Sequence, residues 1–321
     1  MSIDSQRRKL LALAAATGAA SLLPGFARAA EEVTVRIGYQ KSSTLITLLK
    51  ANGTLEKRLE PLGAKVTWHE FASGLPLLEA LNVGSVDFSA DVADTVPVFA
   101  LAAGAKLAYV AQEAPSPTAQ SIVVRADSPI RSVADLKGKR VAVAKAAGAH
   151  YLLIALLEKH GLSFKDIEPA YLTPADGRAA FERGSVDAWV IWDPFLAAVQ
   201  RQSQARVLAD GKGVADYQRY YLASLDFYNK RANLVAVFYD ELKKAGRWVK
   251  QNPKEAAAQL APVWGLDAGT VEAANARRSY DVRAVSAESL VEQQKIADTF
   301  HAQGLLPRKV EIAVTLWKPP A

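Results

Sequence analysis

The pattern of apolar and polar positions predicts two successive units of alternating strands and helices. In the first unit, strand patterns occur at 33–39, 64–71 and 86–90, and helical patterns at 43–59 and 75–82. In the second unit, strand patterns occur at 140–144, 167–172 and 186–192, and helical patterns at 149–160 and 175–182. Each unit has the order βαβαβ, which builds a parallel sheet covered by helices.

A repeated tetrapeptide supports this division into two units. Gly84-Ser85-Val86-Asp87 recurs as Gly184-Ser185-Val186-Asp187, and a helical run precedes the glycine in both places. Glycine suits the left-handed residue that ends a helix, and the valine then opens a strand. The shared context makes a duplicated local structure a better explanation than chance.

The segments outside the two units predict a molecule with two lobes. A strand pattern at 121–125 lies between the units, another at 220–224 follows the second, and 231–304 is mostly helical. A chain that leaves one α/β lobe, builds another and returns crosses between them twice. We therefore expect a ligand cleft between lobes joined by a two-segment hinge. Lobe 1 is expected to comprise 30–122 and about 222–321, and lobe 2 about 123–221.

The first residues have the three-part pattern of a secretory signal. Arg7-Arg8-Lys9 precedes an apolar run at 10–23, which is shorter than the roughly 20 residues that span a bilayer. Small residues at Ala27 and Ala29 suit a signal peptidase, so we expect cleavage near Ala29 and a periplasmic mature protein. The paired arginines favour twin-arginine export over general secretion, and both routes remain open.

Composition excludes several kinds of chemical site and of partner. The length of 321 residues suits about two domains, and the absence of cysteine excludes disulfides, iron–sulfur clusters and a cysteine nucleophile. The formal charge is +6, but residues 1–29 hold four basic and one acidic residue, so the remainder has 35 basic and 32 acidic residues, a net +3. The remainder shows no dense basic stripe, and we expect no nucleic-acid partner.

Candidate ligand contacts follow the predicted strands, because ligands of open parallel sheets lie beyond the strands' carboxyl ends. The residues at these places are Gln40, Ser42, Ser43, Ser73, Gly74, Asp94, Thr95, Gly148, His150, Arg178, Trp192 and Asp193. Hydroxyls and helix N-termini bind anions by donating hydrogen bonds. The set predicts a small anion with an apolar tail, which Trp192, Tyr39 or Phe71 can cover.

Several of these candidates have structural alternatives. Arg178 is the best single candidate for a fixed cation, although a helix arginine is usually solvated. The serine and threonine candidates can simply cap helices, and His150 can be an exposed first-turn residue. Asp91 and Asp94 would repel an anion unless they face a cation, so their contact with the ligand is left open. A sulfonate or sulfate fits the donors, since it needs no proton acceptor.

The chain resembles the aliphatic-sulfonate substrate-binding proteins of ABC transporters, and the segments that carry this resemblance are 38–42, 71–81, 132–142 and 179–194. The resemblance covers nearly all of the chain after residue 29. It implies a periplasmic-binding-protein type II fold whose two lobes close on an alkanesulfonate. It also implies a monomer without a cofactor that docks on a membrane permease driven by an ATPase, for sulfur acquisition.

Two segments depart from the pattern of that family. Family members often have Thr-Gly-Asp or Thr-Gly-Glu after the third strand, where this chain has residues 90–95 without it. The family's Lys-Gly-Ser-x-x-His loop is Lys145-Ala146-Ala147-Gly148-Ala149-His150 here, so one hydroxyl donor is missing. Taurine, nitrate, a sulfate ester and a thiamine-pyrimidine precursor therefore stay open as alternative ligands.

Two rival functions have less support. Desulfinases with this scaffold use a cysteine, which this chain lacks, and Gly-x-Ser-x-Gly, His-Glu-x-x-His and Walker motifs do not occur. We therefore expect a binding protein and no enzyme. A regulatory ligand-binding domain would follow a DNA-reading helix-turn-helix, whereas this chain begins with an export signal.

Overall fold

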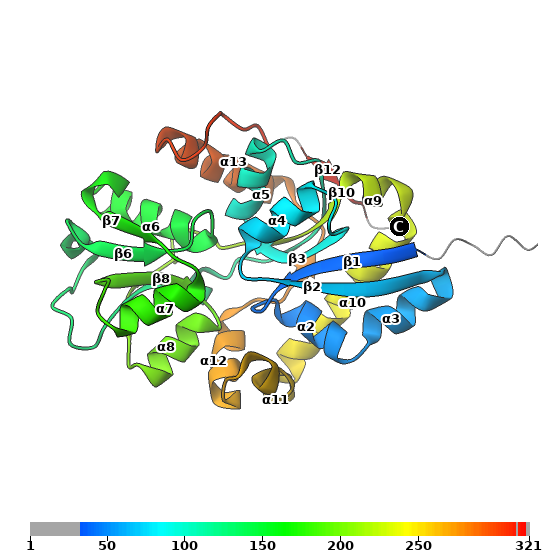
Figure 1. Cartoon of the computed structure of the whole chain (residues 1–321), viewed down its shortest axis with the longest axis horizontal. Helices are drawn as coiled ribbons and strands as arrows, with labels where there is room; N and C mark the ends of the chain where they lie inside the picture. The colour runs from blue at the N-terminus through cyan, green and yellow to red at the C-terminus, as the bar shows by residue number, and fades with distance from the viewer. Residues whose placement is uncertain (1–32, 313, 319–321) are drawn as a thin grey trace, which may run out of the picture. The chain divides into compact units, whose positions relative to one another are not determined.

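Two β-sheets organise the described part of the chain, which comprises residues 33–312 and 314–318 of a computed structural model. The first sheet has the strand order β11-β4-β10-β3-β1-β2, with β12 paired to β4, and the second has the order β7-β6-β8-β5-β9. This mixed α/β architecture confirms the predicted fold class (Figure 1). The predicted export signal lies outside the described residues.

The first sheet is assembled from segments far apart in the sequence. Its strands are β1 (Val33–Gln40), β2 (Ala64–Phe71), β3 (Phe88–Ala93), β4 (Leu107–Glu113), β10 (Arg219–Ser224), β11 (Val282–Arg283) and β12 (Thr315–Leu316). Strands β1 and β3 are parallel, as predicted, whereas β10 lies antiparallel between β3 and β4. The returning chain is thus inserted into the centre of this sheet.

The second sheet comes from one continuous stretch. Its strands are β5 (Gln120–Val124), β6 (Arg140–Val143), β7 (Glu168–Tyr171), β8 (Ala188–Trp192) and β9 (Arg206–Asp210). Strand β6 is parallel to both β7 and β8, and β5 is antiparallel to β8 and β9. The chain crosses between the sheets at 114–119, from β4 to β5, and at 211–218, from β9 to β10.

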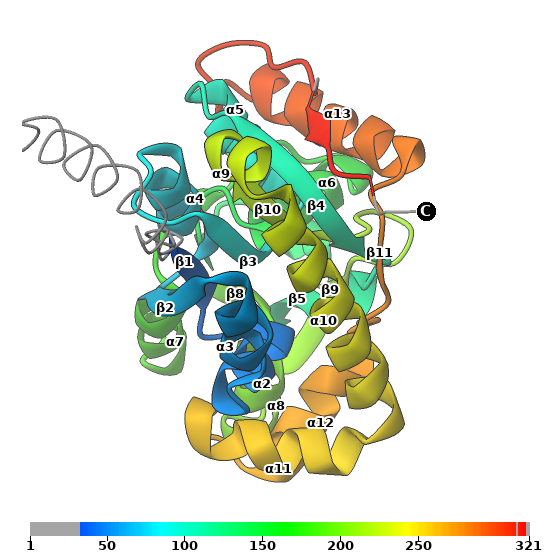
Figure 2. The ribbon, with the colours of Figure 1, turned by 90° about the vertical axis from the view of Figure 1, so that its right-hand side faces the viewer.

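Helices cover both faces of each sheet (Figure 1). On the first sheet, α4 (Gly74–Asn82), α5 (Thr95–Ala102) and α13 (Ala287–Ala302) lie opposite α2 (Thr44–Ala51), α3 (Thr54–Leu59) and α10 (Ala232–Gln251). Figure 2 shows α10 in front of β10 and β4. On the second sheet, α6 (Gly148–Lys159) lies opposite α7 (Pro174–Glu182) and α8 (Phe195–Gln202). The remaining helices are α9 (Leu225–Lys230), α11 (Pro253–Trp264) and α12 (Ala268–Arg277), with 3-10 turns at Glu60–Leu62, Pro117–Ala119, Val133–Leu136 and Phe164–Asp166.

The core lies on the central strands of the two sheets. Every residue of β3, β4, β5 and β8 is buried. Continuous burial of this kind requires covering layers on both faces, which the helices supply. Phe88 of β3 stacks on Phe238 of α10 with ring centroids 4.1 Å apart, so the long helix is held to the sheet centre.

The repeated tetrapeptide forms the same structure twice. Gly84 and Gly184 have φ values of +74° and +72°, and each ends a helix. Asp87 accepts a hydrogen bond from the Arg36 amide at 2.8 Å, and Asp187 accepts one from the Arg140 amide at 2.8 Å. In both units the aspartate thus fastens the turn to the start of the neighbouring strand.

Two expectations differ from the structure. The helix predicted at 43–59 is divided into α2 and α3, because Gly53 adopts a φ of +59° that ends the first helical run. Strands β4 and β9 were not predicted. The residues of β4 are all buried, so its sequence lacks the alternation that marks a half-exposed strand.

Candidate functional site

A small cavity lies between loops that follow strands of both sheets. In the described arrangement it is nearly closed, with a volume of about 10 Å3, and its lining residues are Gln40, Gly74, Ala93, Val96, Ala147, Gly148, Trp192, Tyr217 and Arg219. The structure thus brings together four of the predicted residues, Gln40, Gly74, Gly148 and Trp192. All four were predicted from their position at or after the end of a strand, where parallel sheets bind ligands.

Two helix N-termini face this cavity without a capping side chain. Helix α4 begins at Gly74 and α6 begins at Gly148, and neither Ser73 nor Ala147 makes a side-chain cap. By contrast, side chains cap α7, α9, α12 and α13. The first amides of a helix have no partner within the helix, so those of α4 and α6 are available to an anion.

Glycine allows the cavity walls to approach each other closely. A Cβ atom on Gly148 would lie 2.6 Å from Cε2 of Tyr217 and 3.1 Å from the Cβ of Ala93. A Cβ atom on Gly74 would lie 2.9 Å from Cγ2 of Val96. Both helix starts therefore present bare backbone to the cavity, which a larger residue would push apart.

Polar contacts join the two sheets beside the cavity. The Thr95 hydroxyl donates to the Ala146 carbonyl at 2.7 Å, and Trp192 Nε1 donates to the Ser42 hydroxyl at 3.4 Å. Ser42 and Thr95 follow strands of the first sheet, whereas Trp192 ends β8 and Ala146 follows β6 of the second. The predicted residues Ser42, Thr95 and Trp192 thus take part in holding the two sheets together in the described arrangement.

Arg219 is the cation that the structure places at the cavity. It is the first residue of β10, its side chain is 2% exposed, and its Nε lies 2.6 Å from Oδ2 of Asp91. It also donates to the Tyr217 hydroxyl at 2.7 Å. The sequence analysis missed it because the strand pattern begins at Tyr220, and a lone arginine before a strand carries no motif.

Arg219 belongs to a buried ionic network. Arg278 Nη2 lies 3.2 Å from Asp91 Oδ2 and 2.7 Å from Glu113 Oε2, and Tyr221 donates to Glu113 at 2.8 Å. Burial acts to lower the pKa of Arg278, but Glu113 and Asp91 outweigh it and hold that pKa well above its ordinary value. Two arginines balance two carboxylates, so Asp91 faces cations, as an anion site requires.

Arg178 does not lie at the cavity, in contrast to its prediction as the fixed cation. It lies on the exposed side of α7, where it donates to Glu182 at 2.9 Å and to Gln202 at 2.7 Å. These partners occupy the guanidinium in a surface network, which is the usual place of a helix arginine.

His150 also differs from its prediction. It is fully buried, and its ring packs within 5.4 Å of the rings of Phe164, Tyr171 and Phe300. Its Nδ1 accepts a hydrogen bond from the Ala146 amide at 3.3 Å. Burial lowers the pKa of His150 to about 4, with the charge of Lys145 adding to the effect. The residue holds the loop before α6 and does not line the cavity.

The remaining candidates support the loops around the cavity. Asp193 is paired with Arg277 at 2.9 Å, and Asp94 accepts a hydrogen bond from the Gln218 amide at 3.0 Å. Burial raises the pKa of each carboxyl to about 7. Ser43 accepts from the Gln40 amide at 3.3 Å, and Ser73 precedes the first turn of α4. None of these four residues lines the cavity.

The part of the chain covered by 33–312 and 314–318 brings together no three histidine, cysteine, aspartate or glutamate side chains that could hold a metal ion. Within the same part, no helix has the length and apolarity needed to cross a membrane.

Comparison with solved structures gives close matches in both sequence and fold. The alkanesulfonate-binding protein SsuA from Xanthomonas axonopodis pv. citri, bound to MOPS, is 42% identical with a TM-score of 0.83, covering 88% of this chain and 98% of that one. The periplasmic aliphatic sulphonate binding protein SsuA from Escherichia coli is 41% identical with a TM-score of 0.80, covering 89% and 97%.

Sequence comparison agrees. A protein of Escherichia coli (strain K12) named for aliphatic-sulfonate binding is 42% identical over 297 residues, which are 92% of each chain. The family model NMT1/THI5 like matches residues 63–256. The chain therefore belongs to the NMT1/THI5-like family and, within it, to the aliphatic-sulfonate-binding proteins.

Proposed function

We propose that this protein captures an aliphatic sulfonate in the cavity between its two sheets and delivers it to an ABC permease. The observation that carries the proposal is the 42% identity to a solved alkanesulfonate-binding protein, 98% of which the chain covers. That protein is bound to MOPS, a molecule with a sulfonate group.

The chemistry of the cavity supports a sulfonate. A sulfonate has three oxygens that accept hydrogen bonds and no proton to give. The cavity offers donors in the first amides of α4 and α6 and in the Arg219 guanidinium. Val96, Ala93 and Ala147 supply apolar contacts for the first carbons of the tail.

The same lining argues against taurine as the preferred ligand. Taurine adds an ammonium group, which needs a carboxylate or several acceptors close to the tail. No carboxylate belongs to the described lining, and Asp91 behind Arg219 is already paired with two arginines. We therefore expect an alkanesulfonate without an ammonium group to bind more tightly than taurine.

The two-lobed organisation provides the mechanism of capture. We propose the lobes predicted above, with the crossings 114–119 and 211–218 as the two hinge segments. A ligand that contacts loops of both sheets stabilises the closed arrangement, so binding shifts the equilibrium between open and closed lobes. We further propose export with removal of the first 29 residues, a periplasmic monomer, and binding without chemistry or cofactor.

The test is titration calorimetry on the mature, ligand-stripped protein in a buffer that is free of sulfonates and poor in phosphate. The panel is ethane-, butane- and octanesulfonate, taurine, nitrate and sulfate. We expect alkanesulfonates to bind with dissociation constants on the order of micromolar, about 8 kcal/mol. Binding of taurine or nitrate in preference to every alkanesulfonate would replace the proposed substrate and keep the transport role.

A further inference from the structure

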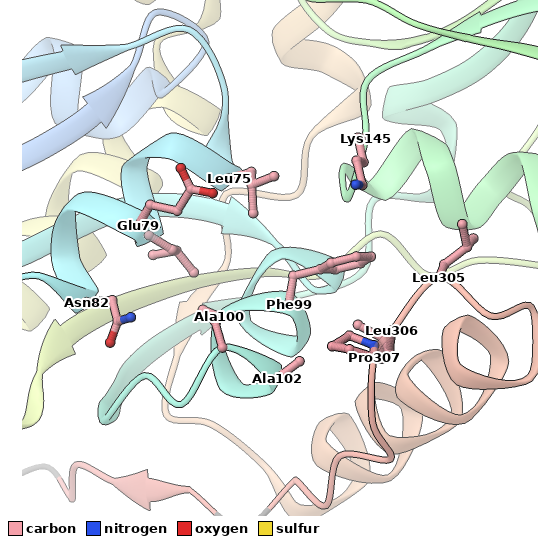
Figure 3. Close-up of a pocket in the computed structure, with 12 residues that line it drawn as sticks. Leu75, Glu79, Asn82, Phe99, Ala100, Ala102, Lys145, Leu305, Leu306 and Pro307 are labelled. Carbon is pink, nitrogen blue, oxygen red and sulfur yellow. The ribbon is translucent and has the colours of Figure 1, made fainter.

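A second, larger hollow lies beside the cavity. Its volume is about 290 Å3, and its lining residues are Leu75, Leu78, Glu79, Asn82, Phe99, Ala100, Ala102, Ala103, Lys145, Leu305, Leu306 and Pro307 (Figure 3). Helices α4 and α5 and the segment after α13 supply most of these residues. We call this feature the apolar groove, because most of its lining side chains are hydrocarbon.

The apolar groove continues from the cavity along the same elements. On α5, Val96 lines the cavity and Phe99 the groove, three residues further along one helical face. On α4, Gly74 lines the cavity and Leu78 the groove, four residues further along one face. The loop before α6 places Ala147 at the cavity and Lys145 at the groove. The cavity and the apolar groove thus share walls that are formed by α4, α5 and the loop before α6.

The two spaces suit different parts of one ligand, the head group and the alkyl tail. The cavity is polar at its helix N-termini and has a free volume of only about 10 Å3 in the described arrangement, so it has no room for a long alkyl chain beside a bound head group. In Figure 3 the side chains of Leu75 and Phe99 lie on either side of the space that Lys145 reaches from the second sheet. The alkyl chain of a ligand that leaves the cavity beside Gly74 meets the side chains of Leu75 and Phe99 first.

We propose that the apolar groove is the subsite for the tail of long-chain aliphatic sulfonates. This inference rests on the proposed function, because it assumes that the sulfonate group lies in the cavity. The occupant is a hydrocarbon chain that is attached to a bound anion, which continuity with the cavity favours over a second protein. Short sulfonates fill the cavity alone, whereas longer ones add the contacts of the groove.

The proposal predicts how affinity changes with chain length. Burying a methylene group strengthens binding roughly fourfold at most. We expect the dissociation constant to fall from ethane- to butane-, hexane- and octanesulfonate, by up to roughly fourfold for each methylene that enters the groove. Titration calorimetry of this series on the full mature protein measures the dependence.

A variant of the groove tests its role directly. Leu75 is half-buried, so Leu75→Asp places a charge in the groove without opening the core. We expect it to weaken octanesulfonate binding at least tenfold and to leave ethanesulfonate binding within about twofold. The matched control is Val83→Asp on the exposed end of the same helix, 74% exposed and outside the groove, which should change neither ligand.

A filling variant provides a second test in case Leu75→Asp fails to fold. Ala103 is exposed at the end of α5 and lines the groove. Ala103→Trp should reduce the gain in affinity from butanesulfonate to octanesulfonate and leave the affinity for butanesulfonate unchanged. Thermal unfolding by circular dichroism establishes that each variant is folded.

The outcomes separate this inference from the proposed function. Equal affinity of wild-type protein for all chain lengths would overturn the tail subsite and leave the sulfonate function standing. Absence of binding to every sulfonate would overturn both. Unchanged sulfonate binding in Leu75→Asp, together with a change in sedimentation of the free protein, would assign the groove to contact between two copies and overturn the inference.

Discussion

Arg219 connects the chemistry of the cavity to the stability of the fold. Its guanidinium lines the cavity, yet its charge is already balanced by the Asp91 carboxylate 2.6 Å away. Arg278 contacts the same carboxylate from another side at 3.2 Å. Asp91 therefore fixes Arg219 in place, and the arginine can donate to a ligand without reorganising.

We predict that Arg219→Gln weakens sulfonate binding roughly tenfold to a hundredfold, because a charged donor is lost. The same change should lower the free energy of unfolding by about 3 kcal/mol, since Asp91 loses one of its two cations in a buried site. Calorimetry and urea unfolding measure the two effects.

The double variant Asp91→Asn with Arg219→Gln separates ligand contact from structure. It removes both charges, so stability should recover relative to Arg219→Gln while binding stays weak. If binding recovers as well, Arg219 affects the ligand only through the fold, and its assignment to the site is wrong.

Gly148 gives a second prediction for a single residue. Its φ lies outside the left-handed region, so alanine fits the backbone, but the added Cβ would lie 2.6 Å from the Tyr217 ring. We expect Gly148→Ala to weaken sulfonate binding roughly tenfold, because overpacking opposes the closed arrangement.

The matched control is Gly269→Ala in the first turn of α12. There the added Cβ would meet the flexible end of Arg201 and the Oδ1 atom of Asp267, each at 3.2 Å, and no backbone or ring atom. This control should bind sulfonates like the wild-type protein. Equal binding by Gly148→Ala and the control would show that the loop before α6 does not approach the ligand.

The residues that sequence analysis identified are those whose place depends on local structure alone. Gln40 ends a strand, and Gly74 and Gly148 begin helices; a short window of sequence shows both kinds of boundary. Arg178 and His150 also occur near strand ends, but the face on which a helical residue lies depends on packing. Arg219 reaches the cavity only because β10 returns to the first sheet.

Among elements, the two βαβαβ units were predictable because each is built from neighbouring segments. The periodicity and the repeated tetrapeptide indicated both of them. The insertion of β10 between β3 and β4 was not predictable from pattern, because it pairs residues such as Arg219 and Ala93 that are distant in sequence. The pairing of β11 and β12 with β4 also joins residues that are distant in sequence, so it was not predictable from pattern either.

The junction of β3 and α5 leads to a prediction of pH dependence. The pKa of Asp94 is raised to about 7, mainly by burial. The charge of Asp216 adds to the rise, and the amides of Gln218 and Thr95 and the charge of Arg219 oppose it. An unfolded aspartate has a pKa of about 3.9. Between these two values the folded state binds more protons, so the stability that Asp94 contributes is full at low pH and is lost as pH rises through about 7.

We therefore expect Asp94→Asn to flatten the dependence of stability on pH. The difference in unfolding free energy between about pH 5 and about pH 8 should shrink, by at most about 1.4 kcal/mol per pH unit in the titration range. Urea unfolding at the two pH values measures it. An unchanged difference would show that Asp94 titrates with an ordinary pKa.

At the scale of the whole molecule, several contacts join the described loops of the two sheets near the cavity. They include the hydrogen bond from Thr95 to Ala146 and the weaker one from Trp192 to Ser42. Because a ligand adds contacts to both sides, it should stabilise the closed protein as a unit. On the proposed two-lobed mechanism, ligand binding and lobe closure are linked in one equilibrium, so a change in one changes the other.

The last prediction concerns this coupling. With a dissociation constant on the order of micromolar, about 1 mM butanesulfonate should add about 4 kcal/mol to the stability of the folded state. For a chain of this size that corresponds to a rise in Tm of roughly 10 °C, measured by calorimetric melting with sodium chloride at equal ionic strength as the reference. In Gly148→Ala the rise should be smaller, because the added methyl group opposes closure. A full rise in that variant would mean that the ligand binds one lobe without closing the other on it.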